Sequence, residues 1–455
     1  MKIALVTVLC AATLSQPAAA QSASSQKAWT LRECCDYAVA HNIAIKQKDN
    51  MRQQQAIQLS TARNSRLPDL NASASESFSF GRGLTLDNTY TNRSTSSTGF
   101  SIGTSVPLFT GFQIPNQIKL NQLNLDAATA DLEKARNDIR MQVAQTYVQI
   151  LYGMEIADVA YRQIAIDSQQ VARLEAFVNN GKASVADLSQ QQATLAQARL
   201  TATQADNQLQ LAILALTQLL ELPSLEGFTI VRPLLSPDGN TTDITQKTKV
   251  TVSGLSPDAI YQEALAVKPE VEAERIRLNA AERSIDIAKS ALYPTLSLNA
   301  GLQTNYYKTS GMPADPFGTQ LKNNFAQYIG LNLNIPIFNR FQTRNNIRAA
   351  RLDRENQQLQ LENVRKSLYK EIQQVYYNAL AAESKYNSSH AAAQSSRDAF
   401  QLVQAKYENG KSAITEFNVA KNNYLRAESD LVQARYELLY QQALLDFYRG
   451  RDLNF

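Results

Sequence analysis

The stretches FVNNGKASVADL (residues 177–188) and KYENGKSAITEF (residues 406–417) contain the same Asn-Gly-Lys turn, and an acid follows six residues after each glycine. The two glycines, Gly181 and Gly410, are separated by 410 − 181 = 229 residues. The segments VPLF (106–109) and IPIF (335–338) have the same separation, 335 − 106 = 229. Two copies of a unit of about 200 residues are therefore predicted, which indicates a domain duplication and not a solenoid of short repeats.

Long helices are predicted on both sides of each turn. Between Pro115 and Pro223 the sequence has no proline and only two glycines, and the same holds from residue 337 to the end. A helix over residues 116–179 would be about 95 Å long, which exceeds any compact domain. Because glycine tolerates the left-handed conformation that ends helices, each copy is predicted to contain a long helical hairpin with its tip at Asn-Gly-Lys. Steps of four and three predict a coiled-coil seam in the first helix, at Ile150, Met154, Ala157, Tyr161, Ile164, Ser168 and Val171.

Four amphipathic strands of about 10 residues are predicted, two before each hairpin, which is the length that a tilted strand needs to cross an outer membrane. A half-buried hairpin of a soluble protein has the same alternation. The GRG segment at Gly81 is interpreted as a turn in a loop between the first two strands. Four strands cannot close a barrel, since small barrels need about eight, so two or three chains must combine their strands. The alternating apolar positions are Leu70, Ala72, Ala74, Phe78 and Phe80; Phe100, Ile102, Val106 and Leu108; Leu296, Leu298, Ala300, Leu302 and Tyr306; and Phe325, Ile329, Leu331, Leu333, Ile335 and Ile337.

A helix is predicted before the strands of each copy. Residues 31–67 contain neither proline nor glycine, which indicates one helix of moderate amphipathicity. In the second copy, Pro269 divides the corresponding stretch, so a helix is expected to begin near this proline. Cys34 and Cys35 are adjacent and cannot join comfortably to each other, which predicts two core-facing thiols and no disulfide framework.

The two ends of the chain and its charge limit the function classes. Residues 1–20 read as a secretory signal, with Lys2, an apolar run and an Ala-x-Ala site before Gln21. Removing it lowers the formal net charge of the chain from +4 to +3, and no basic block remains to bind nucleic acid. The predicted organisation is a first repeat over 21–221, a linker over 222–257, a second repeat over 258–448 and a tail over 449–455.

These features together resemble the TolC family of outer-membrane efflux proteins. The residues that carry the resemblance are the two hairpin tips, the opening WTLRECCDYAVAHN (29–42), the strand-final VPLFTGF and IPIFNRF, and the 229-residue duplication. The resemblance implies a mainly α fold with a small β part: coiled-coil hairpins in an α-barrel, and four strands per chain in a trimeric 12-stranded transmembrane β-barrel. It also implies a homotrimer in outer-membrane lipid that serves tripartite efflux or type I secretion, with a periplasmic adaptor and an inner-membrane RND or ABC-type pump.

The family assigns a role to the tips as the periplasmic entrance, which is closed at rest. By position, Asp187 and Tyr407 match a pair that ties neighbouring hairpins together in the family, and a hydroxyl that donates to a carboxylate makes a charge-assisted bond. Glu416 matches a position that supplies an acidic ring. Two departures put the strength of the lock and the cation selectivity in doubt: Ser412 stands where the best-known member of the family has an Arg lock, and Val419 stands where that member has a second ring Asp.

A simpler interpretation of the same acids is that they start helices. Ser184 and Asp187 form a Ser-x-x-Asp capping pattern, and an acid in a first helical turn is favoured by the helix dipole. Glu416 lacks a capping serine three residues before it, which favours the gate for that residue. The expected tip residues, which either contact the adaptor or are simply exposed, are Gly181, Lys182, Gly410 and Lys411.

Other function classes have less support. His41 and His390 lie in unrelated helical contexts, so no catalytic, metal-binding or cofactor-binding residue is predicted. The main alternative is a periplasmic adaptor or coiled-coil scaffold protein, which would share the signal and the long hairpins. Adaptors usually carry one hairpin within compact β domains, whereas this chain has two hairpins and two strand pairs in repeat.

Overall fold

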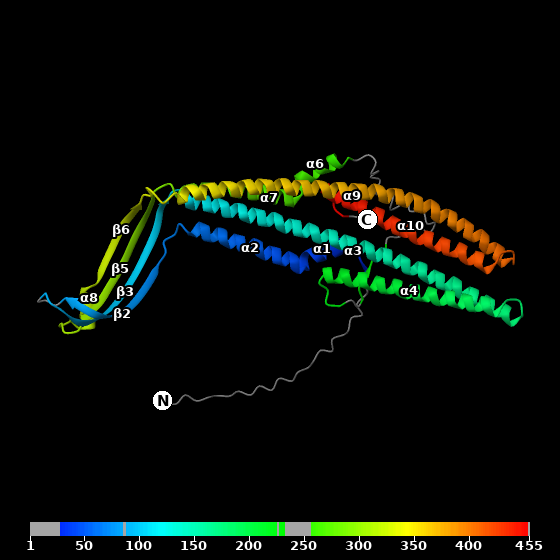
Figure 1. Cartoon of the computed structure of the whole chain (residues 1–455), viewed down its shortest axis with the longest axis horizontal. Coiled ribbons are helices and arrows are strands. Elements are labelled where there is room, and N and C mark those ends of the chain that lie inside the picture. Colours follow the sequence, from blue (N-terminus) through cyan, green and yellow to red (C-terminus); the bar gives the residue numbers. More distant parts are fainter. Residues whose placement is uncertain (1–27, 85–87, 225–226, 233–255, 454–455) are drawn as a thin grey trace, which may run out of the picture.

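The computed structural model describes residues 28–84, 88–224, 227–232 and 256–453. Figure 1 shows an elongated molecule with a β-sheet at one end, long helices that extend from it, and two hairpin tips at the opposite end. The predicted signal (1–20) and most of the predicted linker (222–257) lie outside the described residues.

Four long helices form the two predicted hairpins. The first consists of α3 (Gln113–Asn179) and α4 (Val185–Leu219), and the second of α9 (Gln342–Glu408) and α10 (Ile414–Tyr448). The outgoing helices have 67 residues each and the returning helices have 35 each. At 1.5 Å per residue, α3 and α9 are therefore about 100 Å long. In the described part of the chain, no helix has a stretch that is both long and apolar enough to cross a membrane.

The hairpin tips have the predicted glycine geometry. Gly181 has φ +72° and Gly410 has φ +68°, in the left-handed region. At the first tip, the N–H of Lys182 donates to Phe177 O (2.8 Å) and the N–H of Gly181 donates to Val178 O (2.9 Å), which satisfies the last carbonyls of α3. A Cβ on either glycine would meet no atom within 4 Å. The backbone angle alone therefore selects glycine.

The expectation of one helix over residues 31–67 was wrong, because the chain breaks at Asn42 into α1 (Leu31–His41) and α2 (Ile43–Asn64). The Asn42 side chain accepts from Ala44 N (2.9 Å) and donates to Leu219 O (3.1 Å), so it caps α2 and anchors it to α4. The second copy has α6 (Pro257–Val267) and α7 (Pro269–Ser290), with the break at Pro269 that the sequence predicts.

The sheet has four antiparallel strands in the order β2-β3-β5-β6. They are β2 (Asn71–Leu84), β3 (Tyr90–Thr110), β5 (Thr295–Thr309) and β6 (Ala326–Asn334). A short helix, α8 (Phe317–Asn323), lies between β5 and β6 in the chain. The four predicted strands are confirmed.

Two details of the strand prediction were wrong. Gly81 lies within β2, paired with Arg93, and not in a turn. The ladder continues past this glycine to the pair of Leu84 with Tyr90. Before it, serines and threonines pair across the two strands, and Glu76 Oε1 accepts from Ser96 Oγ (2.8 Å). Ile335 and Ile337 lie beyond the end of β6, since Pro336 between them has no N–H to donate to a ladder.

The predicted seam of α3 was wrong by one residue at three positions: Gly153, Ala160 and Asp167 are buried in place of Met154, Tyr161 and Ser168. Its buried residues include Ile150, Gly153, Ala157, Ala160, Asp167, Val171 and Leu174, which keep the heptad spacing. Tyr161, which was predicted in the seam, is 51% exposed. Hydropathy favours the larger apolar neighbour, but the contact selects small residues: a Cβ on Gly153 would lie 3.3 Å from Leu209 Cδ1 of α4.

The main core lies where α1, α3, α4 and α10 meet. Cys34 and Cys35 are buried in it as free thiols, as predicted. Two short parallel strands, β1 (Ala28–Trp29) and β4 (Thr229–Ile230), lie beside this core. The hydroxyl of Tyr147 in α3 donates to Trp29 O (3.2 Å) and Val231 O (2.9 Å) and so ties both strands to the helix.

Candidate functional site

The first hairpin tip places Asp187 in the first turn of α4. The hydroxyl of Ser184, the N-cap, accepts from Asp187 N (3.0 Å) and donates to Asp187 Oδ2 (2.7 Å). The predicted Ser-x-x-Asp capping interaction is therefore present. The Asp187 side chain is also exposed, so its carboxylate remains accessible to a second partner.

The second hairpin tip is built without a side-chain cap. Ala413 is the N-cap of α10, and Glu416 lies in the first turn. Glu416 Oε2 accepts from the hydroxyl of Ser412 (2.5 Å), so these two tip residues contact each other. Val419, one turn further along α10, is 60% exposed.

Tyr407 lies at the end of α9, where aromatic side chains cover it. It is 9% exposed, and its ring stacks on that of Phe417 with the centroids 4.9 Å apart. Burial raises the pKa of Tyr407, the nearby Asp187 carboxylate adds to this increase, and the Arg173 guanidinium opposes it. The hydroxyl is therefore a protonated donor at neutral pH. Among the described residues, Tyr407 and Asp187 form no hydrogen bond within one chain, although the charge of one affects the pKa of the other.

Arg173 is a tip residue that sequence reasoning missed. Its guanidinium lies 5.0 Å from the ring centroid of Tyr407 and 5.4 Å from that of Phe177. Its Nη2 donates to Glu408 O (3.2 Å), which is at the C-terminal end of α9. Arg173 thus joins the two hairpins of one chain close to their tips. An arginine one turn before Phe177 is the only signal that the sequence offers for this contact.

The structure brings the predicted tip residues to one end of the molecule (Figure 1). Gly181 and Lys182 at the first tip and Gly410 and Lys411 at the second are all exposed. The two lysines lie near the acids that follow them, so charges of both signs are present at this end. In the described residues, no three His, Cys, Asp or Glu side chains are grouped closely enough to hold a metal ion.

The opposite end of the molecule carries an exposed apolar sheet face. Ile329 is 76% exposed, Leu331 66% and Leu302 42%, and the strand register places Leu302 on the same face as Ile102. Neighbouring positions along the strands carry polar side chains, among them Asn299. Water would not stabilise such a face in a single chain, so a lipid or protein surface is needed to cover it.

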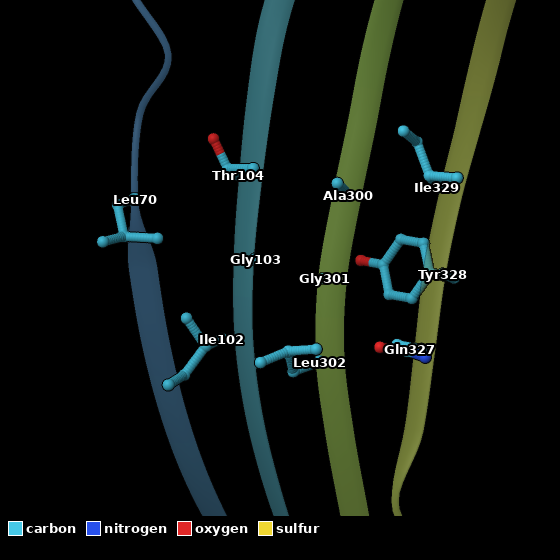
Figure 2. Close-up of a pocket in the computed structure, with 10 residues that line it drawn as sticks. All are labelled: Leu70, Ile102, Gly103, Thr104, Ala300, Gly301, Leu302, Gln327, Tyr328 and Ile329. Atoms are coloured by element: carbon cyan, nitrogen blue, oxygen red, sulfur yellow. The ribbon is translucent and has the colours of Figure 1, made fainter.

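A shallow hollow on this sheet contains an aromatic contact. Figure 2 shows the Tyr328 ring directed across Gly301 toward Gly103. These three residues share one register level. A Cβ on Gly301 would lie 2.8 Å from the Tyr328 ring, so glycine is what admits the ring. The residues that line the hollow are uncharged and mostly apolar or small.

Comparisons with known proteins agree with this geometry. A family model described as outer membrane efflux protein matches residues 36–221 and 260–451. The chain is similar to the outer membrane efflux protein BepC of Brucella suis, with 23% identity over 381 residues that cover 82% of this chain and 76% of BepC. It shares the fold of a CusC crystal structure (TM-score 0.74, 18% identity, 92% of this chain and 91% of CusC). The outer membrane protein VceC of Vibrio cholerae also matches, with TM-score 0.71, 18% identity, and 93% of this chain and 97% of VceC covered.

Proposed function

The chain belongs to the outer membrane efflux protein family, and from this premise we propose that three copies form a passive duct that is gated at the hairpin tips. It is an outer-membrane exit duct with a large helical extension into the periplasm. The observation that carries the proposal is the direct continuation of sheet into helix: β3 ends at Thr110 and α3 begins at Gln113. A conduit that starts between the strands therefore continues along the helices.

Glycine makes the junction between strand and helix possible. Gly111 has φ +60°, and a Cβ there would lie 2.5 Å from Ser290 O of α7. The backbone of the junction is therefore packed directly against the end of a neighbouring helix. A tight junction of this kind holds the direction of α3 relative to β3.

The free edges of the sheet support assembly from several copies. An unpaired edge in lipid leaves backbone groups without hydrogen bonds. Asn71 of β2 and Tyr328 of β6 lie at the same level of the sheet, because Asn71 pairs with Gly103, Gly103 with Gly301, and Gly301 with Tyr328. From this level β2 continues in one direction to Leu84, whereas β6 continues in the other to Asn334. Closed barrels need tilted, staggered strands of this kind, and the resemblance to the TolC family supports three copies.

The exposed tips are the proposed contact for a periplasmic adaptor, which would connect the duct to an inner-membrane pump of the RND or ABC type. They are separated from the sheet by helices about 100 Å long, and so they project far from the membrane. Lys182 and Lys411 are exposed there beside Asp187 and Glu416. A complementary adaptor surface would present acidic and hydrogen-bonding groups to the lysines.

The gate proposed at the tips consists of Asp187, Tyr407 and Glu416. Tyr407 is a buried donor held in place by Phe417, and Asp187 is an exposed acceptor whose charge reaches it. In an assembly, the Asp187 carboxylate of one hairpin would accept from a tyrosine hydroxyl and hold the tips together. Three Glu416 carboxylates around a common axis would favour cations.

Single-channel conductance in a planar lipid bilayer tests both the duct and the gate. The purified wild-type protein is expected to form a small, stable pore. Asp187→Asn combined with Tyr407→Phe removes the charge and the donor but preserves side-chain shape, so this variant is expected to have a severalfold larger conductance. Ser184→Ala is the control for the cap: it removes the cap and the hydroxyl that donates to Asp187 Oδ2, at a cost of about 1 kcal/mol, but it keeps the Asp187 charge and the Tyr407 donor.

The outcomes separate the interpretations. If Ser184→Ala widens the pore as much as the double variant does, Asp187 acts only as a helix cap. If neither variant changes the pore, the duct remains and the gate proposal fails. If the wild type forms no pore and does not fractionate with the outer membrane, the adaptor or scaffold alternative replaces the duct.

A further inference from the structure

Four polar side chains, three of them buried and one partly buried, meet between the two hairpins of one chain, about 20 Å from the first tip along α3. We call them the buried quartet: Asp167 of α3, Gln191 of α4, and Asn418 and Lys421 of α10. Asp167 and Lys421 are fully buried, and Gln191 is 1% exposed. Charged residues are almost never buried to this degree unless they are paired. The burial of the quartet therefore depends on the pairing of its charges across the contact between the hairpins.

The hydrogen bonds of the quartet divide into two kinds. Two of them cross between the hairpins: Lys421 Nζ donates to Asp167 Oδ1, and Asn418 Nδ2 donates to Gln191 Oε1 (3.1 Å). Two others stay within a hairpin: Gln191 Nε2 donates to Asp167 Oδ1 (3.1 Å), and Lys421 Nζ donates to Asn418 Oδ1 (3.3 Å). If the hairpins separate, each charged group retains a hydrogen-bond partner on its own side.

The polar contact continues along the same two helices away from the tips. Arg162 of α3 pairs with Glu428 of α10 (2.8 Å), and Glu155 of α3 pairs with Arg435 of α10 (2.5 Å). The side chain of Arg162 is 55% exposed and that of Glu428 is 16% exposed, so this pair reaches solvent on the arginine side, whereas Asp167 and Lys421 are fully buried. The second carboxylate oxygen of Asp167, Oδ2, is buried without a hydrogen bond. Glu428 Oε2 is also buried without a hydrogen bond, so the quartet differs from the neighbouring pair in its complete burial and not in its hydrogen bonding.

The energetics of a buried ion pair differ from those of an apolar contact. Taking two charges out of water costs a large part of what their attraction returns, so separating and rehydrating them changes the free energy little. Separating apolar side chains exposes them to water, which always favours the joined state. A buried ion pair therefore fixes the register of two helices without holding them together permanently.

We propose that the buried quartet is a reversible latch: it holds α10 against the α3–α4 hairpin when the duct is shut and separates into two internally bonded halves when the duct opens. This rests on the proposed function, because it requires a duct that opens by moving the two hairpins apart. The latch acts through the position of α10, which carries Glu416. Asp167 and Lys421 are positioning residues and do not contact the transported substrate.

The test uses the full-length protein in planar bilayers and records the frequency of opening under stepped voltage, together with the thermal midpoint. Lys421→Met leaves Asp167 buried without a cation, so this variant is expected to open at least about tenfold more often than the wild type. Asp167→Leu with Lys421→Met replaces the ion pair by an apolar contact of similar volume. We expect this double variant to have an unchanged or higher thermal midpoint and to open at least about tenfold less often.

The matched control is Arg162→Met with Glu428→Leu, which removes a partly exposed ion pair between the same two helices. It is expected to change the opening frequency less than about twofold. If either charge-removing variant misfolds, Asp167→Asn preserves the shape and removes one charge, and it is expected to open severalfold more often than the wild type.

The latch is overturned if the double variant has a raised midpoint but opens as often as the wild type, since the quartet would then be structural only. It is also overturned if Lys421→Met or Asp167→Asn opens no more often than the wild type. A wild-type protein that forms no pore contradicts the proposed function itself. A wild-type pore with unaltered variants contradicts the latch alone.

Discussion

The two hairpin tips share one backbone but differ in what holds them. Both turn at a left-handed glycine, and both are followed by an acid in the first turn of the returning helix. At equivalent positions, 229 residues apart, the first tip has Val178 and Leu188 where the second has Tyr407 and Phe417. The duplicated turn therefore fixes the path of the chain at both tips, whereas side-chain packing makes the two tips chemically different.

The two tips are stabilised in different ways, the first by contacts local in sequence and the second by tertiary packing. The first tip begins α4 with the Ser184 cap, which is formed within a few residues. The second tip begins α10 at Ala413 without a side-chain cap and buries Phe417 completely beside Phe400 and Tyr407. The first tip is stabilised by its own sequence, and the second depends on contacts across its hairpin and on Arg173 of the first hairpin.

The largest expected effect is a loss of stability that differs between the two tips because their side chains pack differently. Phe417→Ala removes a fully buried ring and leaves a cavity, so it should reduce the free energy of unfolding of the second hairpin by about 3–5 kcal/mol. Leu188→Ala, the matched change in the first tip, should cost less because Leu188 is only half-buried. Urea unfolding with hydrogen exchange at residues 400–417 measures both. Equal losses would show that the second tip has no special core.

A smaller effect should be the same at both tips. Gly181→Ala and Gly410→Ala each place a Cβ in the left-handed region, which costs about 1–2 kcal/mol. Because neither new methyl group meets an atom within 4 Å, the cost comes from the backbone alone. The two thermal midpoints should fall by similar amounts. A much larger fall for one variant would mean that packing, and not the φ angle, selects glycine at that tip.

The smallest effect depends on pH and belongs to the second tip alone. Burial raises the pKa of Tyr407 above its ordinary value of 10.0. A raised folded-state pKa gives stability that is fully present below about pH 10 and is lost as the pH rises through the folded pKa. The thermal midpoint of wild type minus that of Tyr407→Phe should therefore decrease above pH 10. A difference that stays constant up to pH 11 would show that the ionised form is tolerated.

The sequence predicts the long-range plan of this fold better than its local boundaries. The 229-residue offset and the scarcity of proline and glycine predicted both hairpins, because helices of this length leave a strong signal over many residues. The break at Asn42 was missed because one asparagine makes both the helix cap and the bond to Leu219 O, which is distant in sequence. The continuation of β2 past Gly81 was missed because its last three residues, Arg82, Gly83 and Leu84, show no apolar alternation.

The candidate site shows the same division between local and distant contacts. The bond between Ser184 and Asp187 was predictable because its partners are three residues apart. Arg173 and the buried quartet were not, since each joins residues more than 200 positions apart with no motif to link them. Hydropathy also argued against Asp167, because a charged residue is not expected in a seam.

The unpaired edges of β2 and β6 also determine the order of events by which the molecule reaches its membrane. A lone chain that entered lipid would leave two rows of backbone groups unsatisfied, at a cost of several kcal/mol for each group. In the proposed assembly of three copies, subunit encounter must therefore precede or accompany insertion, which makes biogenesis concentration-dependent. Until then the chain has an exposed apolar sheet face with open edges, the kind of surface that aggregates and needs a chaperone. The rate of delivery to the outer membrane should accordingly rise more steeply than in proportion to the amount of chain exported.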